Sequence, residues 1–165
     1  MKLTDLITNS LAIGIGATVF MDIWALIQKH VFRQKTLDYA LVGRWAGHLA
    51  LGRRIGGHIS SAAIIPNERA LGWTIHYLTG VIFAAIFLAI IGEDWMQSPA
   101  IAPALLFGAV SVLAPFLILQ PGLGAGIAAS RTPEPNVARA KSLVTHLMFG
   151  LGLYLSALGL QMISG

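Results

Sequence analysis

The sequence predicts an all-α membrane protein, a polytopic four-helix bundle, and three observations lead to that class. Hydrophobic residues make up 56% of the 165 positions and charged residues only 11%, with a mean hydropathy of +0.74. This is far more apolar than a soluble domain of the same length. Four stretches are long enough to cross a hydrocarbon core of about 30 Å, which takes about 20 helical residues. The charges gather in the connections between these stretches.

The expected spans cover about residues 6–28, 71–91, 101–119 and 142–163, with long connections at 29–70 and 120–141. Together they use the whole of residues 1–165, so we expect a single membrane domain. We do not expect the first span to be a cleaved signal peptide, because its apolar run is too long and basic residues follow it. The chain has no cysteine, which excludes disulfides and thiolate metal sites.

The basic residues are distributed very unevenly across the predicted membrane. Ten of the 11 lie in the two long connections, and only Lys2 lies on the other side. Cytoplasmic connections carry such an excess, so we expect both long connections in the cytoplasm and both termini outside. The ten are Lys29, Arg33, Lys35, Arg44, Arg53, Arg54, Arg69, Arg131, Arg139 and Lys141.

The whole chain has a net charge of +4 and a pI near 9.9, and most of its basic residues belong to the surface formed by the two long connections. Because it lies next to the predicted bilayer, we expect it to face anionic lipid headgroups and expect no nucleic-acid partner. Four arginines are the candidates for contact with headgroups or phosphate: Arg44, Arg69, Arg131 and Arg139.

Two segments of the chain, 69–80 and 139–150, share one pattern: Arg-Ala-x-small-x-x-x-His-x-x-x-Gly. Each segment opens a predicted span, so the pattern predicts two parallel helix-hairpin repeats. The repeats place His76 and His146 at the same depth, about 10 Å beyond the preceding arginine at 1.5 Å per residue.

The first connection contains a further short helix. Apolar and aromatic residues recur there at helical spacing, which predicts an amphipathic helix in the membrane interface with Trp45 at headgroup depth. These residues are Leu37, Leu41, Trp45, His48 and Leu49. We expect the three histidines of this connection, His30, His48 and His58, to be solvated or to contact headgroups.

Pro115 lies inside the third predicted span. A proline at such a position has no N–H for the helix, so it should kink the span and free a backbone carbonyl.

Four polar residues lie within or at the end of the apolar stretches and are the candidate site: Asp22, His76, His146 and Gln120. Ionisable side chains are costly inside a membrane and mark functional sites there. Small residues lie four positions from several of them, as Gly80 does from His76, and such faces are where membrane helices approach closely. We therefore expect these side chains to face neighbouring helices, not lipid.

Three kinds of function remain open for this cluster. The favoured one is non-enzymatic binding or passage of a small cation or proton. The second is a bis-histidine haem b or divalent-metal protein, acting in redox chemistry or as an intramembrane enzyme. In the third, the polar groups only hydrogen-bond between helices, as in an accessory subunit of a larger complex. We assign no catalytic residue.

Five segments carry a resemblance that covers nearly the whole chain: ATVFMD (17–22), LVGRW (41–45), ERALGW (68–73), APFLILQP (114–121) and GIAASRTP (126–133). In these the chain resembles a family of small four-span bacterial inner-membrane proteins of unknown function. The resemblance implies a location in the bacterial inner membrane and implies no activity or site residue. A bundle of four helices is small for a transport path, so a homodimer or larger membrane complex is expected on size alone.

Overall fold

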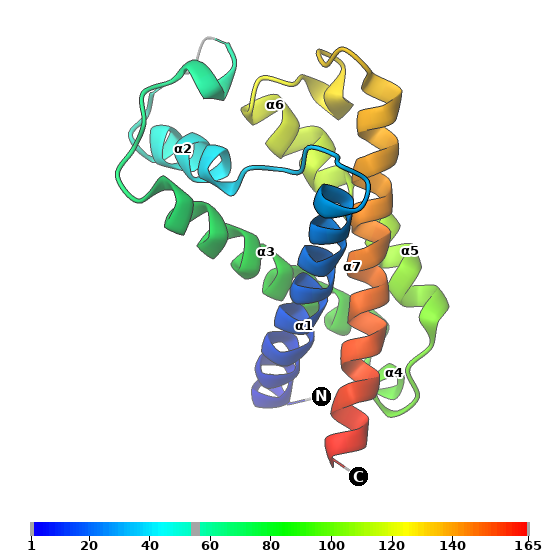
Figure 1. Ribbon diagram of the computed structural model, residues 1–165. Coiled ribbons are helices and arrows are strands. Elements are labelled where there is room, and N and C mark those ends of the chain that lie inside the picture. The colour runs from blue at the N-terminus through cyan, green and yellow to red at the C-terminus, as the bar shows by residue number, and fades with distance from the viewer. Residues whose placement is uncertain (1, 54–56, 165) are drawn as a thin grey trace. The chain divides into compact units, whose positions relative to one another are not determined.

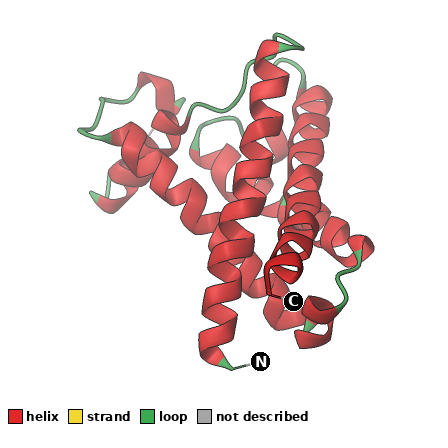
Figure 2. Cartoon of the chain, turned by 60° about the horizontal axis from the view of Figure 1, so that its bottom comes forward, coloured by secondary structure: helices red, strands yellow, loops and turns green. Residues whose placement is uncertain are grey.

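A computed structural model of the protein describes residues 2–53 and 57–164, and over these ranges it contains only helices and loops (Figure 1, Figure 2). Arg54, one of the predicted cytoplasmic basic residues, lies outside the described residues. The helices are α1 (Leu3–His30), α2 (Tyr39–Ala50), η1 (Ile59–Ser61), α3 (Glu68–Ile91), α4 (Glu93–Gln97), α5 (Ile101–Ser111), the π-helical η2 (Pro115–Leu119), α6 (Gln120–Gly122), η3 (Ile127–Ala129) and α7 (Pro135–Ser164).

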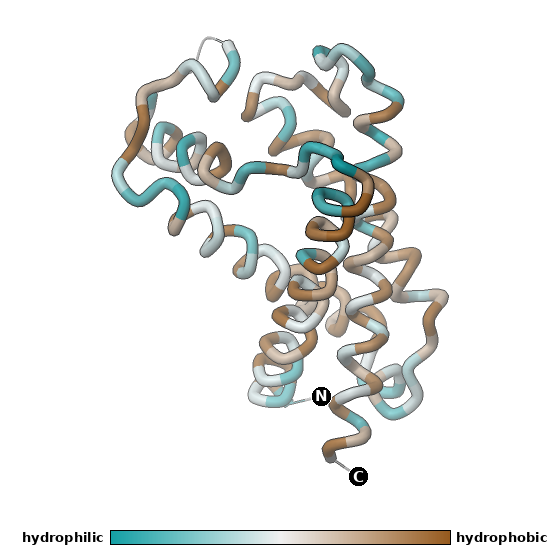
Figure 3. Tube along the Cα trace, viewed as in Figure 1, coloured by the Kyte–Doolittle hydropathy of each residue, from teal (hydrophilic) through white to brown (hydrophobic). Residues whose placement is uncertain are grey.

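Four helical stretches are long and apolar enough to cross a membrane: Leu3–His30, Glu68–Ile91, Ile101–Gly122 and Pro135–Ile163. Each contains one of the four spans expected from the sequence. The hydropathy along the chain shows the same division, with apolar residues along the long helices and polar residues mostly in the connections and at helix ends (Figure 3). The all-α class with four membrane-compatible helices is therefore confirmed.

The described chain divides into two compact units. Unit 1 contains residues 1–36, 77–111 and 143–165, and unit 2 contains residues 37–76 and 112–142. Helices α3 and α7 contribute to both units, since the divisions fall after His76 and after Ser142.

Small residues form the packed faces of unit 1, as is typical of membrane helices. Gly14 of α1 lies against the backbone of Gly80 and Val81 on α3, so closely that no Cβ would fit. Gly108 of α5 and Gly150 of α7 make an equivalent approach. Because glycine lets the backbones come this close, the side chains beside these contacts can reach the neighbouring helix.

The large apolar residues of α1 lie on the outside instead. Six of them are between 41% and 71% exposed: Leu3, Ile7, Leu11, Ile15, Val19 and Ile23. Their spacing of four forms a row that winds slowly around the helix and, at each level, leaves another side for buried residues such as Ile13, Gly14 and Ala17. An exposed apolar face of this size is costly in water and marks a surface for membrane contact.

The helix is irregular around Pro115, where the sequence predicts a disturbance. Helix α5 ends at Ser111, and the chain continues as a π-helical turn from Pro115 to Leu119, in which the Gln120 N–H donates to the Pro115 carbonyl. Proline has no N–H to close an ordinary α-helical turn, and the i→i+5 bond of a π-turn widens the helix locally. The stretch therefore continues as helix through the proline.

Unit 2 is built around the contact of α2 with the first turns of α3. Gly43 lies against the carbonyl of Glu68 and the backbone of Gly72, and Gly72 in turn lies against the carbonyl of Tyr39. A Cβ at either glycine would collide with backbone atoms. The short helix predicted between the first two spans is thus present as α2, and it is seated on α3 through small residues.

Candidate functional site

Asp22 is bonded to a tyrosine of the neighbouring helix in unit 1. It lies on α1 about 12 Å before the end of the helix, at 1.5 Å per residue. The Tyr77 hydroxyl on α3 donates to Oδ2 of Asp22 at 2.9 Å, and both groups are partly buried. The same two helices, α1 and α3, are also in close contact at Gly14 and Gly80. A carboxylate is therefore present on a helix contact, where the sequence predicts it.

His146 has a hydroxyl partner in the same unit. Its Nδ1 lies 2.7 Å from Oγ of Ser111, a residue at the end of α5 that is only 7% exposed. The carbonyl of His146 lies close to Gly108, so the glycine of α5 sets the spacing that this short bond requires. Ser111 is a buried polar residue of unit 1 that the sequence did not single out.

His76 belongs to unit 2 and packs against two aromatic rings, stacked on Tyr39 and edge-on to Trp73. Its Nε2 lies 3.0 Å from the Tyr39 hydroxyl, and the two ring centroids are 4.3 Å apart. The Trp73 ring is tilted against Tyr39, with centroids 4.4 Å apart, and its centroid lies 5.7 Å from that of His76. Imidazole binds metals through a ring nitrogen. A haem iron bound at Nε2 would therefore have to displace the Tyr39 hydroxyl from that nitrogen.

Gln120 lies in unit 2 at the start of α6. Its Nε2 donates to Oγ of Ser142 at 3.1 Å, whereas its Oε1 is buried and has no hydrogen-bond partner. A buried acceptor without a donor is costly. The amide oxygen is thus a place where a donor or a cation would be stabilised.

The basic residues predicted to contact headgroups fall into two groups. Arg69 and Arg131 are exposed. Arg139 donates to the carbonyl of Ala128 at 2.8 Å and to the side chain of Asn136 at 3.0 Å. Arg44 is the most enclosed, with 11% of its side chain exposed.

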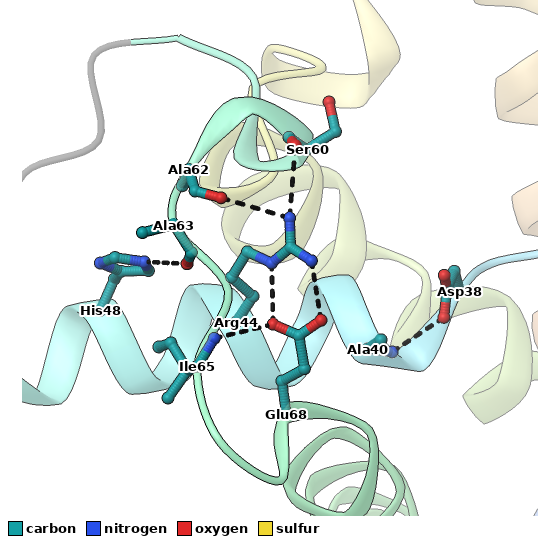
Figure 4. A network of polar contacts seen from close by, with 9 residues as sticks. All are labelled: Asp38, Ala40, Arg44, His48, Ser60, Ala62, Ala63, Ile65 and Glu68. Atoms are coloured by element: carbon teal, nitrogen blue, oxygen red, sulfur yellow. Dashed lines mark hydrogen bonds and ion pairs between the residues drawn. The ribbon is translucent and has the colours of Figure 1, made fainter.

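Arg44 forms a two-pronged ion pair with Glu68 (Figure 4). Its Nε and one terminal nitrogen donate to the two carboxylate oxygens at 2.8 and 2.7 Å, and the other terminal nitrogen donates to the carbonyls of Ser60 and Ala62 at 3.3 Å. The hydrogen bond to Glu68 raises the pKa of Arg44 above its ordinary value. Arg44 therefore joins α2, the following connection and α3, and its guanidinium is largely occupied.

The prediction that His48 is solvated or at the headgroups is wrong. His48 is 5% exposed, and its Nε2 lies 2.8 Å from the carbonyl of Ala63 (Figure 4). The reason is that the connection folds back along α2, so that extended backbone covers this face of the helix. His30 and His58 are exposed, as expected.

The four predicted site residues divide between the units, Asp22 and His146 in unit 1 and His76 and Gln120 in unit 2. Each is bonded to a side chain that the predicted set does not contain, namely Tyr77, Ser111, Tyr39 and Ser142. Among residues 2–53 and 57–164, no three His, Cys, Asp or Glu side chains form a group able to hold a metal ion.

Comparison with known proteins gives one match. A family model described as "Protein of unknown function (DUF2938)" covers residues 11–160 and reaches into all four membrane-compatible helices. No curated protein and no solved structure matches the chain. The protein therefore belongs to the DUF2938 family, whose function is unknown.

Proposed function

We propose that the protein resides in the bacterial inner membrane and binds or passes a small cation or proton through polar side chains of its spans. Its two long connections would face the cytoplasm and its termini the periplasm, as the distribution of basic residues indicates. The proposal concerns a non-enzymatic activity and assigns no catalytic residue.

The observation that carries the proposal is the Asp22–Tyr77 pair. The carboxylate lies well inside an apolar helix whose neighbouring faces expose large aliphatic side chains. An ionisable side chain in such surroundings is expensive and marks a functional site, and a carboxylate can bind a cation or a proton. The Tyr77 hydroxyl, which donates at 2.9 Å, orients the carboxylate.

His146 is the second group of unit 1 that can take a proton, because a neutral imidazole has a ring nitrogen that accepts one. His76 and Gln120 of unit 2 extend the proposed set. The buried, unpartnered Oε1 of Gln120 supports a role in accepting a cation or a hydrogen-bond donor.

The proposed partners are the bilayer and its anionic headgroups. Arg69 and Arg131 are exposed and able to meet a phosphate, whereas Arg44 and Arg139 already make bonds within unit 2. A second copy of the chain or a larger membrane complex would complete a transport path, since one copy offers few helices.

The test is ligand-dependent stabilisation of the purified protein in detergent. A ligand at 100 times its Kd stabilises the folded state by about 2.7 kcal/mol, so titration with Na⁺, K⁺, Mg²⁺ or acid should raise the Tm by several degrees. Asp22→Asn should abolish the response, because it removes the charge and keeps the shape. Asp5→Asn, at an exposed aspartate on the same helix, is the matched control and should respond like the wild type.

A second candidate function is purely structural, and the hydrogen bonds themselves favour it. Each predicted polar residue has a side-chain partner, and such bonds contribute about 0.6 to 2 kcal/mol in membranes. If no cation and no proton changes the Tm of the wild type, while Asp22→Asn lowers it, the structural reading replaces ion binding.

A further inference from the structure

The end of α2 and the connection that follows it present large aliphatic side chains to the outside of unit 2. Leu49, Leu51 and Ile64, which we call the apolar edge, are between 60% and 76% exposed. Nε2 of His48 donates to the carbonyl of Ala63 at 2.8 Å, which brings their chain neighbours Leu49 and Ile64 to the same part of the unit (Figure 4). Exposed apolar residues that lie together mark a surface for contact with a partner or a membrane.

The folded connection turns Ile64 outward. The side chain of Ile65 lies against Gly47 of α2, so closely that a Cβ on the glycine would not fit. Neighbouring side chains of extended backbone point to opposite sides, so Ile64 faces away from α2. Arg44 holds the backbone just before it, at the carbonyl of Ala62. The exposure of Ile64 is therefore built into the fold of the connection.

Two of the residues that the sequence assigns to the membrane side of α2 are used inside unit 2 instead. The Trp45 indole lies against Gly122 of α6, so closely that a Cβ would not fit there. His48 is buried under the connection. A contact of this part of the chain with lipid thus falls to the apolar edge.

Unit 2 fixes α2 at the level where α3 begins. Gly43 lies against the carbonyl of Glu68, and Gly72 lies against the carbonyl of Tyr39. The membrane-compatible stretch of α3 starts at Glu68, so these contacts lie at the boundary of the span. Leu49 follows Gly43 by six helical residues, about 9 Å at 1.5 Å per residue. The apolar edge is therefore within reach of the headgroup region.

The charge of this segment fits an anionic lipid surface. The chain has no acidic residue between Asp38 and Glu68, and Glu68 is paired with Arg44. Arg53 is exposed and lies two positions after Leu51. Exposed aliphatic residues beside a cation are the combination by which interfacial segments bind anionic membranes.

We propose that the apolar edge and Arg53 insert into the headgroup region of an anionic lipid leaflet and seat unit 2 on the membrane surface. The leaflet is the one in which α3 begins. The inference rests on the membrane location in the proposed function, and it gives the headgroup contact a defined surface in which aliphatic side chains act together with a cation.

Nitroxide labels on single engineered cysteines test this contact in vesicles of phosphatidylethanolamine and phosphatidylglycerol. Electron paramagnetic resonance measures how often each label collides with oxygen, which enters lipid, and with a nickel chelate, which stays in water. The oxygen-to-nickel ratio of Ile64→Cys should be several times that of Glu134→Cys, an exposed acidic position in the other long connection. Ile82→Cys, exposed within α3, provides the ratio of a label in lipid.

The anionic headgroup is tested by changing the lipid. In vesicles of phosphatidylcholine alone, the ratio at Ile64→Cys should fall, because Arg53 then has no net negative surface to meet. Adding Arg53→Gln should remove the difference between the two lipid compositions. Equal ratios in both compositions before that substitution would overturn the assignment to anionic lipid.

The remaining outcomes also decide the inference. A ratio at Ile64→Cys as low as that at Glu134→Cys places the apolar edge in water and overturns it. A label that neither oxygen nor nickel reaches overturns it as well, because protein then covers the edge.

Ile82→Cys separates these failures from a failure of the proposed function. If nickel reaches the label at Ile82 as freely as that at Glu134, the membrane location in the proposed function is wrong. If the label at Ile82 reports lipid while that at Ile64 reports water, only the inference about the apolar edge is wrong.

Discussion

At the scale of single residues, three of the polar side chains predicted to form the site are bonded to hydroxyl groups. Asp22 is held by Tyr77, His146 by Ser111 and Gln120 by Ser142. These bonds lower the cost of a polar group away from water. They also fix the orientation of the side chain, which any site for a small ion requires.

The Arg44–Glu68 pair allows a prediction at this scale. Arg44→Lys should lower the Tm, because an ammonium group cannot donate side by side to both carboxylate oxygens as the planar guanidinium does. Glu68→Gln should lower it too, since the arginine would keep its charge and lose its counter-charge. Thermal unfolding in detergent measures both changes.

The neighbouring Arg69 is the matched control, since it is exposed and Arg69→Lys should leave the Tm unchanged. Equal melting temperatures for the wild type and Arg44→Lys would show that the two-pronged geometry does not stabilise unit 2.

The polar residues could be selected from the sequence, but their partners could not. Asp22 and the histidines stand out because ionisable groups are rare in apolar runs. Tyr77 and Ser111 are ordinary residues of membrane helices, and only the positions of the helix faces show that they point at Asp22 and His146. The prediction that His48 is exposed was wrong for the same reason. A connection that folds back over α2 leaves no periodic pattern of apolar residues in the sequence.

At the scale of elements, glycine determines how closely the helices of each unit approach. The spacing of four between His76 and Gly80 predicted such a contact, and Gly80 makes it with Gly14. Gly108 and Gly150 approach each other in the same way. The interruption between α5 and η2 was only partly predicted. The position of Pro115 indicated a disturbance, but it did not indicate that the disturbance would include a π-turn.

Gly72→Ala tests the contact between α2 and α3. The added Cβ collides with the carbonyl of Tyr39, and overpacking of this kind costs about 1 to 3 kcal/mol. We expect a lower Tm and a higher susceptibility of α2 to limited proteolysis.

Gly159→Ala is the control for the glycine substitution itself. A Cβ at Gly159 meets no atom within 4 Å, and alanine is a better helix former than glycine by about 1 kcal/mol. This variant should melt at or above the wild-type temperature. If Gly72→Ala behaves in the same way, the close approach of α2 and α3 is not needed for stability.

At the scale of the whole molecule, composition and charge predicted the fold class and the four long helices. They did so because the bilayer imposes helix length and apolarity on every span. The predicted orientation in the membrane can be tested with single engineered cysteines. The chain contains no cysteine of its own, so each engineered thiol is the only one available for labelling.

A membrane-impermeant maleimide applied to intact cells should label Asp94→Cys and should label Glu134→Cys only after the membrane is permeabilised. Both positions are exposed, and they lie in different connections. If the reagent labels only Glu134→Cys in intact cells, the protein has the opposite orientation to the one predicted.

The ion pair between α2 and α3 also acts as a non-covalent cross-link along the chain. Glu68 follows Arg44 by 24 positions, and the guanidinium also donates to the carbonyls of Ser60 and Ala62 between them. The carboxylate in turn accepts from the N–H of Ile65. The pair therefore fixes the backbone from Ser60 to Glu68 in addition to joining two helices, and loss of either charge would release this backbone together with the contact between α2 and α3.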